Sequence, residues 1–315
     1  MLLFAALAFA ENPPPPPIVN GETTSDYPEV LFLYMTDKRE SVGGACTGSL
    51  VADDWVLTAA HCVSDSPGFK LYSVSAHVGK DTNHLTQSID ADEWFAHPDY
   101  DGASYTNDIG LVHLSQGFKG ISLMPVDLDG LIPEDEGDDL RLVGFGATGD
   151  NDAGGLMRKR TADVPLEEYN RSLLLTYDQE DEQNACHGDS GGPVLRLRED
   201  GGYATLGVMD AVGGNNPDCE GNGLWSARID AYTDFIDAYV DVQSYDELRE
   251  GGSGAGDDEG SLRGDDDGSG ASDVFGSDQN AISCASGGAS PSPAAMLLLL
   301  ASALTARRAP GSRRR

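Results

Sequence analysis

The chain has 315 residues, enough for one large domain or two smaller ones with a substantial buried core. Its formal net charge of −33, from 53 acidic and 20 basic residues, argues against nucleic acid or an anionic membrane surface as a partner for the body of the protein. The same charge predicts a strongly hydrated, self-repelling surface and says nothing about the charge of a substrate.

Residues 1–10 form a short apolar run that ends in Ala8-Phe9-Ala10. Small residues at the last and third-last positions are typical of a signal-peptidase site, so we predict a signal peptide over residues 1–10 and cleavage before Glu11. The run is too short to remain in a bilayer as a spanning helix. Residues 11–17 contain a proline run, which predicts an extended pro-segment without a hydrogen-bonded ladder.

Residues 18–240 alternate short apolar runs with clusters of Gly, Asp, Asn and Pro. This pattern predicts an all-β sandwich or barrel. The runs expected to form strands are Val30–Tyr34, Trp55–Ala60, Tyr72–Val78, Ile109–Leu114, Leu140–Phe145, Val194–Leu197 and Leu206–Met209. A helical period occurs near the end of the region, where one face of an amphipathic helix would hold Tyr232, Phe235, Ile236, Tyr239 and Val240.

Residues 241–283 are rich in Gly, Ser and Asp, so they predict a flexible acidic linker with too little apolar surface to fold. The acidic triplet Asp265–Asp267 lacks the spacing of an EF-hand loop, and no metal site is expected there. Residues 284–315 contain Cys284, the apolar run Ala294–Ala306 and five arginines near the terminus. Arginines that stay cytoplasmic would leave the rest of the protein outside the cell.

Candidate catalytic residues occur in three separate stretches. Ser190 lies within Cys-His-Gly-Asp-Ser-Gly-Gly-Pro, among glycines that allow the backbone to approach a substrate closely. A serine needs a base to become a nucleophile, and the base needs an orienting group. His61 follows an apolar run and Asp108 precedes another, where a carboxylate can hydrogen-bond a histidine and fix its tautomer. Each residue alone is more often structural, so the prediction depends on their occurring together.

The five cysteines divide into four in residues 18–240 and one in the tail. In an exported protein the four are expected to form two disulfides, and three pairings remain open from the residues alone. The four are Cys46, Cys62, Cys186 and Cys219, while Cys284 is left over.

Together these motifs resemble the trypsin/chymotrypsin-like serine endopeptidase family, over residues 18 to about 240. The motifs, in the order of the family, are Ile18-Val19-Asn20-Gly21, Thr58-Ala59-Ala60-His61-Cys62, Asn107-Asp108-Ile109-Gly110-Leu111 and Gly188-Asp189-Ser190-Gly191-Gly192-Pro193. The resemblance implies two six-stranded antiparallel β-barrels with a C-terminal helix and the active site between the barrels. Their boundary would lie near residues 117 to 139.

The resemblance also implies roles for individual residues. Ser190 would be the nucleophile, His61 the general base and then acid, and Asp108 the orienting carboxylate. The backbone N–H groups of Gly188 and Ser190 would form the oxyanion hole. No metal or organic cofactor is implied, and the substrates would be proteins or peptides. The implied disulfides are Cys46–Cys62 and Cys186–Cys219.

The family is activated by a cut that frees an N-terminal Ile, whose ammonium pairs with the Asp before the nucleophile. Here the resemblance implies a pair between Ile18 and Asp189. Pro17 stands where a Lys or Arg usually marks the cut, so a protease of another specificity is expected to activate this chain.

Substrate preference follows from three further positions implied by the resemblance. Asn184 falls at the base of the primary pocket, where an Asp would indicate preference for Arg or Lys; a neutral amide leaves a buried guanidinium without a counter-ion. Val212 and Gly223 would line the walls, and Val212 would narrow the pocket in favour of small or medium apolar P1 residues. Asp210 falls where the family usually has a serine beside the triad carboxylate, and two carboxylates there would raise the pKa of one.

The tail resembles C-terminal sorting signals of the myxobacterial type. That resemblance implies trimming by a membrane protease and anchoring at the cell surface, in the outer membrane, through Cys284. The alternatives are an uncut membrane anchor or a free cysteine that forms intermolecular disulfides. The sequence thus predicts a secreted or surface-anchored serine endopeptidase, and the alternative is an inactive, surface-displayed binding module on the same fold.

Overall fold

The computed structural model describes residues 18–39, 43–148, 157–178, 182–213, 219, 222–251 and 281–283. The segments predicted as signal peptide and pro-segment, and the sorting signal with Cys284, lie outside these residues. Among the described residues, none of the helices combines the length and apolar character needed to cross a membrane.

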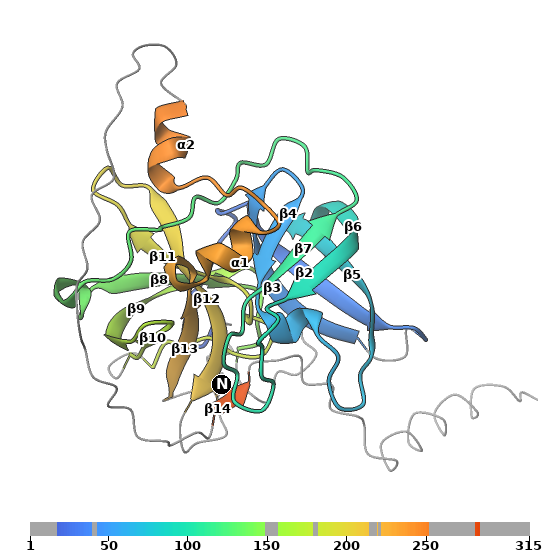
Figure 1. Cartoon of the computed structure of the whole chain (residues 1–315), viewed down its shortest axis with the longest axis horizontal. Coiled ribbons are helices and arrows are strands. Elements are labelled where there is room, and N and C mark those ends of the chain that lie inside the picture. The colour runs from blue at the N-terminus through green and yellow to red at the C-terminus, as the bar shows by residue number, and fades with distance from the viewer. Residues whose placement is uncertain are drawn as a thin grey trace, which may run out of the picture.

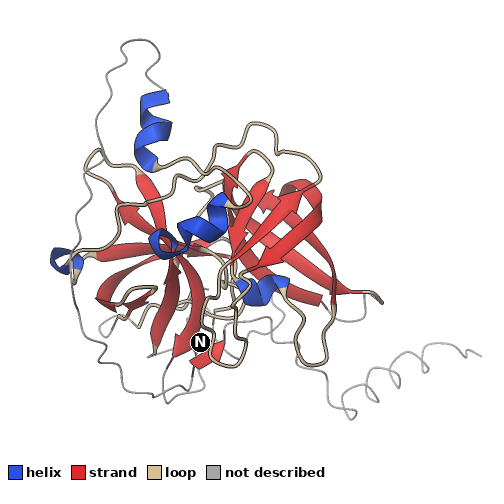
Figure 2. Cartoon of the chain, viewed as in Figure 1, coloured by secondary structure: helices blue, strands red, loops and turns tan. Residues whose placement is uncertain are grey.

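Two closed antiparallel β-barrels lie side by side (Figure 1). Strands make up nearly all of the regular structure (Figure 2). The first barrel closes in the order β2-β3-β4-β7-β6-β5, with strands β2 (Val30–Asp37), β3 (Gly43–Ala52), β4 (Trp55–Thr58), β5 (Leu71–Gly79), β6 (Leu85–Ala96) and β7 (Gly110–Leu114). The second consists of β8 (Asp139–Gly144), β9 (Arg160–Tyr169), β10 (Leu173–Thr176), β11 (Pro193–Leu197), β12 (Tyr203–Gly213) and β13 (Gly223–Arg228). It closes because β8 pairs with both β9 and β11, and the prediction of two six-stranded barrels is confirmed.

Two short strands are added to the second barrel. Strand β1 (Glu22–Thr23) pairs with β9, and β14 (Ala281–Ser283) pairs with the end of β12 at Ala211–Gly213. The connection between the barrels runs from residue 115 to residue 138 and contains one helical turn, η2 (Pro133–Asp135). The expected boundary therefore coincides with this connection.

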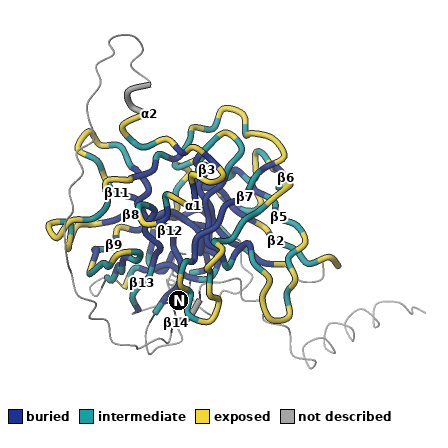
Figure 3. Tube along the Cα trace, in the orientation of Figure 1, coloured by how far each residue is buried: buried dark blue, intermediate teal, exposed yellow. Residues whose placement is uncertain are grey.

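Each barrel is built from the alternation of inward and outward side chains. In β5, Val74, Ala76 and Val78 are buried, while the residues between them, Ser73, Ser75 and His77, are only half-buried, which is the period of two expected of a strand with one face on a core. Burying each such aliphatic side chain is worth about 1.5–3 kcal/mol. Buried positions form the centre of both barrels and exposed ones gather on the loops (Figure 3).

The C-terminal helix is present and short. It consists of the turn η3 (Ile229–Tyr232) followed by α1 (Thr233–Asp237), and Phe235 and Ile236 pack into the core of the first barrel. Tyr239, which the helical period places on the apolar face, lies after the helix and is 39% exposed.

A further helix, α2 (Tyr245–Gly251), lies in the segment that was expected to be a linker. Its N-terminus has a reciprocal cap: the backbone N–H and hydroxyl of Ser244 donate to the carboxylate of Glu247, and the N–H of Glu247 donates back to the Ser244 hydroxyl. Such a capping box satisfies N–H groups that have no partner inside the helix. Local capping therefore starts a helix where composition predicted none.

Candidate active site

His61 and Asp108 are brought together by the pairing of β4 with β7. Thr58 at the end of β4 faces Gly110 at the start of β7, so the residues just beyond these ends lie at the same edge of the first barrel. The Nδ1 of His61 is 2.5 Å from Oδ2 of Asp108, and the backbone N–H of His61 donates to Oδ1 at 2.7 Å. These two contacts set the orientation of the ring and direct Nε2 away from the carboxylate.

Asp108 is fully buried, and burial by itself would raise its pKa. The charge and hydrogen bonds of His61, with a hydrogen bond from Asp210, hold the pKa below its usual value. The carboxyl group is therefore ionised while it accepts the two N–H groups of His61.

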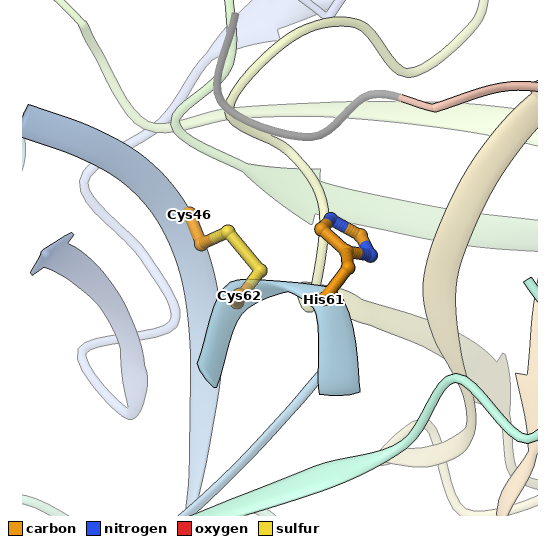
Figure 4. A group of neighbouring side chains, drawn as sticks. All are labelled: Cys46, His61 and Cys62. Atoms are coloured by element: carbon orange, nitrogen blue, oxygen red, sulfur yellow. A yellow bond between two sulfur atoms is a disulfide. The ribbon is translucent and has the colours of Figure 1, made fainter. Parts of the chain in front are cut away.

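A disulfide fixes the helical turn η1 (Ala60–Val63) that carries His61. Cys62 of this turn is bonded to Cys46 of β3, and Figure 4 shows His61 projecting from the same turn. The bond closes a loop of 16 residues, which corresponds to about 3 kcal/mol of stabilisation in the chain-entropy account. His61 consequently has a rigid support on the first barrel.

Ser190 lies in the loop that precedes β11, and it is fully buried. Among the described residues, neither its Oγ nor Nε2 of His61 has a hydrogen-bond partner. The Sγ of Cys62, next to His61, is 3.7 Å from the carbonyl oxygen of Ser190. The turn of His61 and the loop of Ser190 are therefore in contact, but no hydrogen bond joins the two side chains. Catalytic hydrogen bonds are often long before substrate binds.

Thr47 of β3 links the Ser190 loop to the first barrel. Its N–H donates to the carbonyl of Ser190 at 2.8 Å, and its hydroxyl donates to the carbonyl of Gly188 at 2.9 Å. The hydroxyl also accepts the N–H of Phe145 at 3.1 Å. Sequence reasoning missed Thr47, because nothing in the local sequence indicates a contact between residues 141 positions apart.

Two glycines give the Ser190 loop its shape. Gly188 has φ of 99° and Gly191 has φ of 82°, a region that side chains rarely adopt. A Cβ on Gly191 would lie 2.1 Å from the hydroxyl of Thr58 and 2.4 Å from the carbonyl of Thr47. The loop therefore requires glycine at 191 for both backbone conformation and space.

Asp189 is fully buried under this loop. Its carboxylate accepts the N–H of Gly146 at 2.7 Å and that of Cys186 at 2.9 Å. Burial raises its pKa to about 7, although the two N–H groups and the charge of Arg160 act in the opposite direction. A Cβ on Gly146 would lie 2.2 Å from the carboxylate, so glycine is required there as well.

Ile18 and Val19 lie beside the Ser190 loop in the uncut chain. Ile18 is fully buried, and Val19 forms an antiparallel bridge with Asn184 through two backbone hydrogen bonds of 2.8 and 3.3 Å. Val19 also packs against the Cys186–Cys219 disulfide. The nitrogen of Ile18 is an amide in this chain, so it has no ammonium to offer Asp189.

The three predicted pocket residues, Asn184, Val212 and Gly223, all lie in or beside the second barrel. The side-chain amide of Asn184 donates to the carbonyls of Cys219 and Asn222 at 2.9 and 2.8 Å, and its oxygen accepts the N–H of Ala185. Val212 is buried in the core of the second barrel. Gly223 pairs with Gly213, the neighbour of Val212, and β14 lies along the same edge of β12. The side-chain amide of Asn184 therefore joins the backbone at Cys219 to the backbone at Asn222.

Three groups of neighbouring side chains contain the atoms that bind metals in proteins. In two of them the thiols are already bonded as Cys46–Cys62 and Cys186–Cys219, which removes the thiolate ligands. The third is the cluster of His61, Asp108 and Asp210.

Comparison with known proteins agrees with this geometry. The family model described as Trypsin matches residues 18–236. Human chymotrypsin-like elastase family member 3B is 28% identical over 264 residues, which cover 76% of this chain and 96% of that protein. Human kallikrein-7 is 31% identical over 186 residues, 55% of this chain and 70% of that protein. The solved structure of HL collagenase aligns with a TM-score of 0.57 at 23% identity, over 70% of this chain and 97% of that one.

Proposed function

This chain belongs to the trypsin family and is a serine-type endopeptidase, and from this premise we propose that Ser190, His61 and Asp108 are its catalytic residues. Nε2 of His61 takes the proton of Ser190, whose Oγ attacks the peptide carbonyl carbon to give a tetrahedral intermediate. The same imidazole then gives the proton to the amine nitrogen, the C–N bond breaks and the amine leaves the acyl-enzyme, which water hydrolyses with His61 again as the base. Asp108 keeps His61 in the required tautomer and offsets its charge. The main support is the 2.5 Å contact of Asp108 with Nδ1, together with a buried, unpaired Nε2.

The negative charge that develops on the attacked carbonyl oxygen needs donors placed in advance. The N–H groups of Gly188 and Ser190 are proposed to supply them. Thr47 supports this role because it holds the carbonyls of the same two residues from the first barrel, which restrains the loop on the far side of each donor. The carbonyl of His187, which shares a peptide plane with the N–H of Gly188, accepts the N–H of Ala147 at 2.7 Å.

Activation is proposed to follow cleavage before Ile18 by a second protease, since Pro17 does not suit a cut after Lys or Arg. The new ammonium would pair with Asp189. This is supported by the full burial of the Asp189 carboxyl beneath the Ser190 loop and by the bridge between Val19 and Asn184. Sequencing the N-terminus of active protein tests the step: Ile18 is expected, and an active form that begins at Glu11 would contradict it.

The preferred P1 residue is proposed to be small or medium and apolar rather than strictly Arg or Lys. Asn184 carries no charge, and its amide is already bonded to two backbone carbonyls. Val212 and Gly223 are proposed as wall residues. A P1-scanning peptide library tests this preference, and strong cleavage after Arg would refute it.

Export is supported by the two disulfides, which persist in oxidising compartments. The surface location, with the membrane protease that would trim the tail near Cys284, is proposed from the sequence alone. Mass spectrometry of the mature protein should find the tail removed; retention of Arg315 would contradict processing.

A fluorophosphonate probe separates an active peptidase from an inactive binding module of the same fold. The probe is expected to label Ser190 in protein that begins at Ile18, because only an activated serine reacts, and Ser190→Ala is the matched control. No labelling of correctly processed, folded protein would refute the proposed catalysis.

A further inference from the structure

A second buried carboxyl group lies against the proposed catalytic pair. Asp210 belongs to β12, at a point where the register with β13 shifts between Met209 and Ala211. A bulge of this kind re-aims a side chain out of the regular alternation. The carboxyl of Asp210 lies against that of Asp108, and with His61 the three groups place their polar atoms within 4.8 Å of one another.

Two ionised carboxylates at this site would repel each other strongly. Asp108 is fully buried and Asp210 is 2% exposed, so water screens neither charge. In the described part of the chain, the other titratable groups near Asp210 are His61 and the phenols of Tyr100 and Tyr232, and none of these is a permanent cation. A proton held between the two carboxyl groups removes their repulsion, because a protonated carboxyl donates a hydrogen bond to an ionised one.

The neighbours decide which carboxyl carries the proton. Asp108 already accepts two N–H groups from His61, which favours its ionised form. Oδ1 of Asp210 has no partner among the described residues, so nothing comparable stabilises a charge there. Burial, the charge of Asp108 and the hydrogen bond to it raise the pKa of Asp210 well above its ordinary value.

We propose that Asp210 is a positioning residue of the catalytic site: as a neutral carboxylic acid it donates a hydrogen bond to Asp108 and holds that carboxylate in the orientation that His61 requires. This inference rests on the proposed catalytic roles of His61 and Asp108. Asp210 does not touch the reacting atoms, and it acts through Asp108.

The proposal has a consequence for pH dependence. A folded-state pKa raised above the unfolded value means that the contribution of Asp210 is complete at low pH and is lost as pH rises through the folded value. Ionisation would remove the hydrogen-bond donor and place a second negative charge beside Asp108. Activity is therefore expected to fall on the alkaline side.

The test measures kcat and KM against pH for protein that begins at Ile18. Asp210→Asn and Asp210→Ser keep a neutral donor that does not titrate in this range, so both are expected to remain active and to lose the part of the alkaline decline that belongs to Asp210, while the part caused by deprotonation of the Ile18 ammonium remains. Asp210→Ala lacks a donor and is expected to lower kcat by about ten- to a hundredfold, the effect of a lost hydrogen bond to a charged group, with little change in KM. Asp127→Asn is the matched control, because Asp127 is buried with a raised pKa in a separate network with Arg196 and Arg198.

An alkaline decline that persists unchanged in both neutral variants would overturn the proposal. So would loss of wild-type activity on chelation that a divalent cation restores, since a metal rather than a proton would then offset the two charges.

A second measurement does not depend on catalysis. Carboxyl 13C NMR of Ser190→Ala protein that begins at Ile18 should show an aspartic acid signal that stays protonated near neutral pH and is missing from the Asp210→Asn form. If this signal is present while the wild type never reacts with a fluorophosphonate, the proposed function fails and the protonation state of Asp210 stands. If the signal is absent, the inference about Asp210 fails by itself.

Discussion

Freeing Ile18 should change how the stability of the protein depends on pH, and the effect should run through Asp189. In the uncut chain this carboxyl is fully buried beneath the Ser190 loop. We compare the uncut chain with protein that begins at Ile18, and Asp189 with Asp189→Asn in each. All four forms carry Ser190→Ala so that they cannot digest themselves.

The magnitude follows from the pKa of Asp189, which burial raises from 3.8 to about 7. A shift of about three units corresponds to about 4 kcal/mol of unfolding free energy. Because the folded-state pKa is the higher one, this contribution is complete below the unfolded value. It is lost as pH rises from about 4 to about 7.

The uncut chain is therefore expected to lose about 4 kcal/mol of stability between these pH values through this group. Protein that begins at Ile18 offers an ammonium to the ionised carboxylate and should lose much less. Asp189→Asn should remove the decline from the uncut chain as well. The other buried acids with raised pKa values, including Glu29 and Asp127, titrate in all four forms and cancel in the comparison.

The assay is urea unfolding followed by fluorescence of the three tryptophans, at intervals from pH 4 to pH 8. The free energy of unfolding is plotted against pH for each form. Equal slopes in the uncut and Ile18 forms would refute the ion pair. An unchanged slope in uncut Asp189→Asn would refute the assignment of the titration to Asp189.

Three substitutions test the supports of the site. Thr47→Val removes the hydroxyl that donates to the carbonyl of Gly188 and leaves the N–H of Phe145 unpaired. We expect a loss of about 1–3 kcal/mol in unfolding free energy and a lower kcat with KM nearly unchanged. Thr47→Ser keeps the hydroxyl and should stay near wild type in stability and in kcat. Gly146→Ala would place a Cβ against the Asp189 carboxylate, so fluorophosphonate labelling should fall sharply; labelling at the wild-type rate would contradict this packing. Asn184→Asp replaces an amide that donates to two carbonyls with a buried carboxylate. The buried charge should lower Tm strongly at pH 7 and less at pH 4, where the carboxyl is protonated more often. An equal fall in Tm at pH 7 and pH 4 would count against the buried charge as the cause.

The strands that sequence reasoning found are those with a compact apolar run, such as Val30–Tyr34 within β2 and Val194–Leu197 within β11. Strand β6 was missed because half of its 12 residues are exposed and only Ile89 is buried, so its membership depends on pairing with β5 and β7. Strand β9 contains Pro165, which lowers the strand signal. Helix α2 was missed although its cap, Ser244 with Glu247, is visible in the sequence.

The residues of the candidate site also fall into those that the sequence predicts and those that only the structure reveals. His61, Asp108 and Ser190 could be predicted because each lies in a short motif with recognisable chemistry. Thr47 could not, because its role exists only once two distant segments meet. Asp210 was identified as an unusual residue, but the location of the proton depends on the two N–H groups that His61 gives to Asp108.

The bonds of Thr47 to the Ser190 loop also bear on when this enzyme becomes complete during folding. They close a loop of 141 residues and join one barrel to the other, and contacts of such long range form slowly. The elements that bring His61 and Asp108 together, which are β4, β7 and the Cys46–Cys62 bond, all lie within the first barrel, whereas Asp210 belongs to the second. The Ser190 loop acquires its support only when the second barrel docks. A chain that is still folding would therefore carry the proposed base, His61, without the proposed nucleophile.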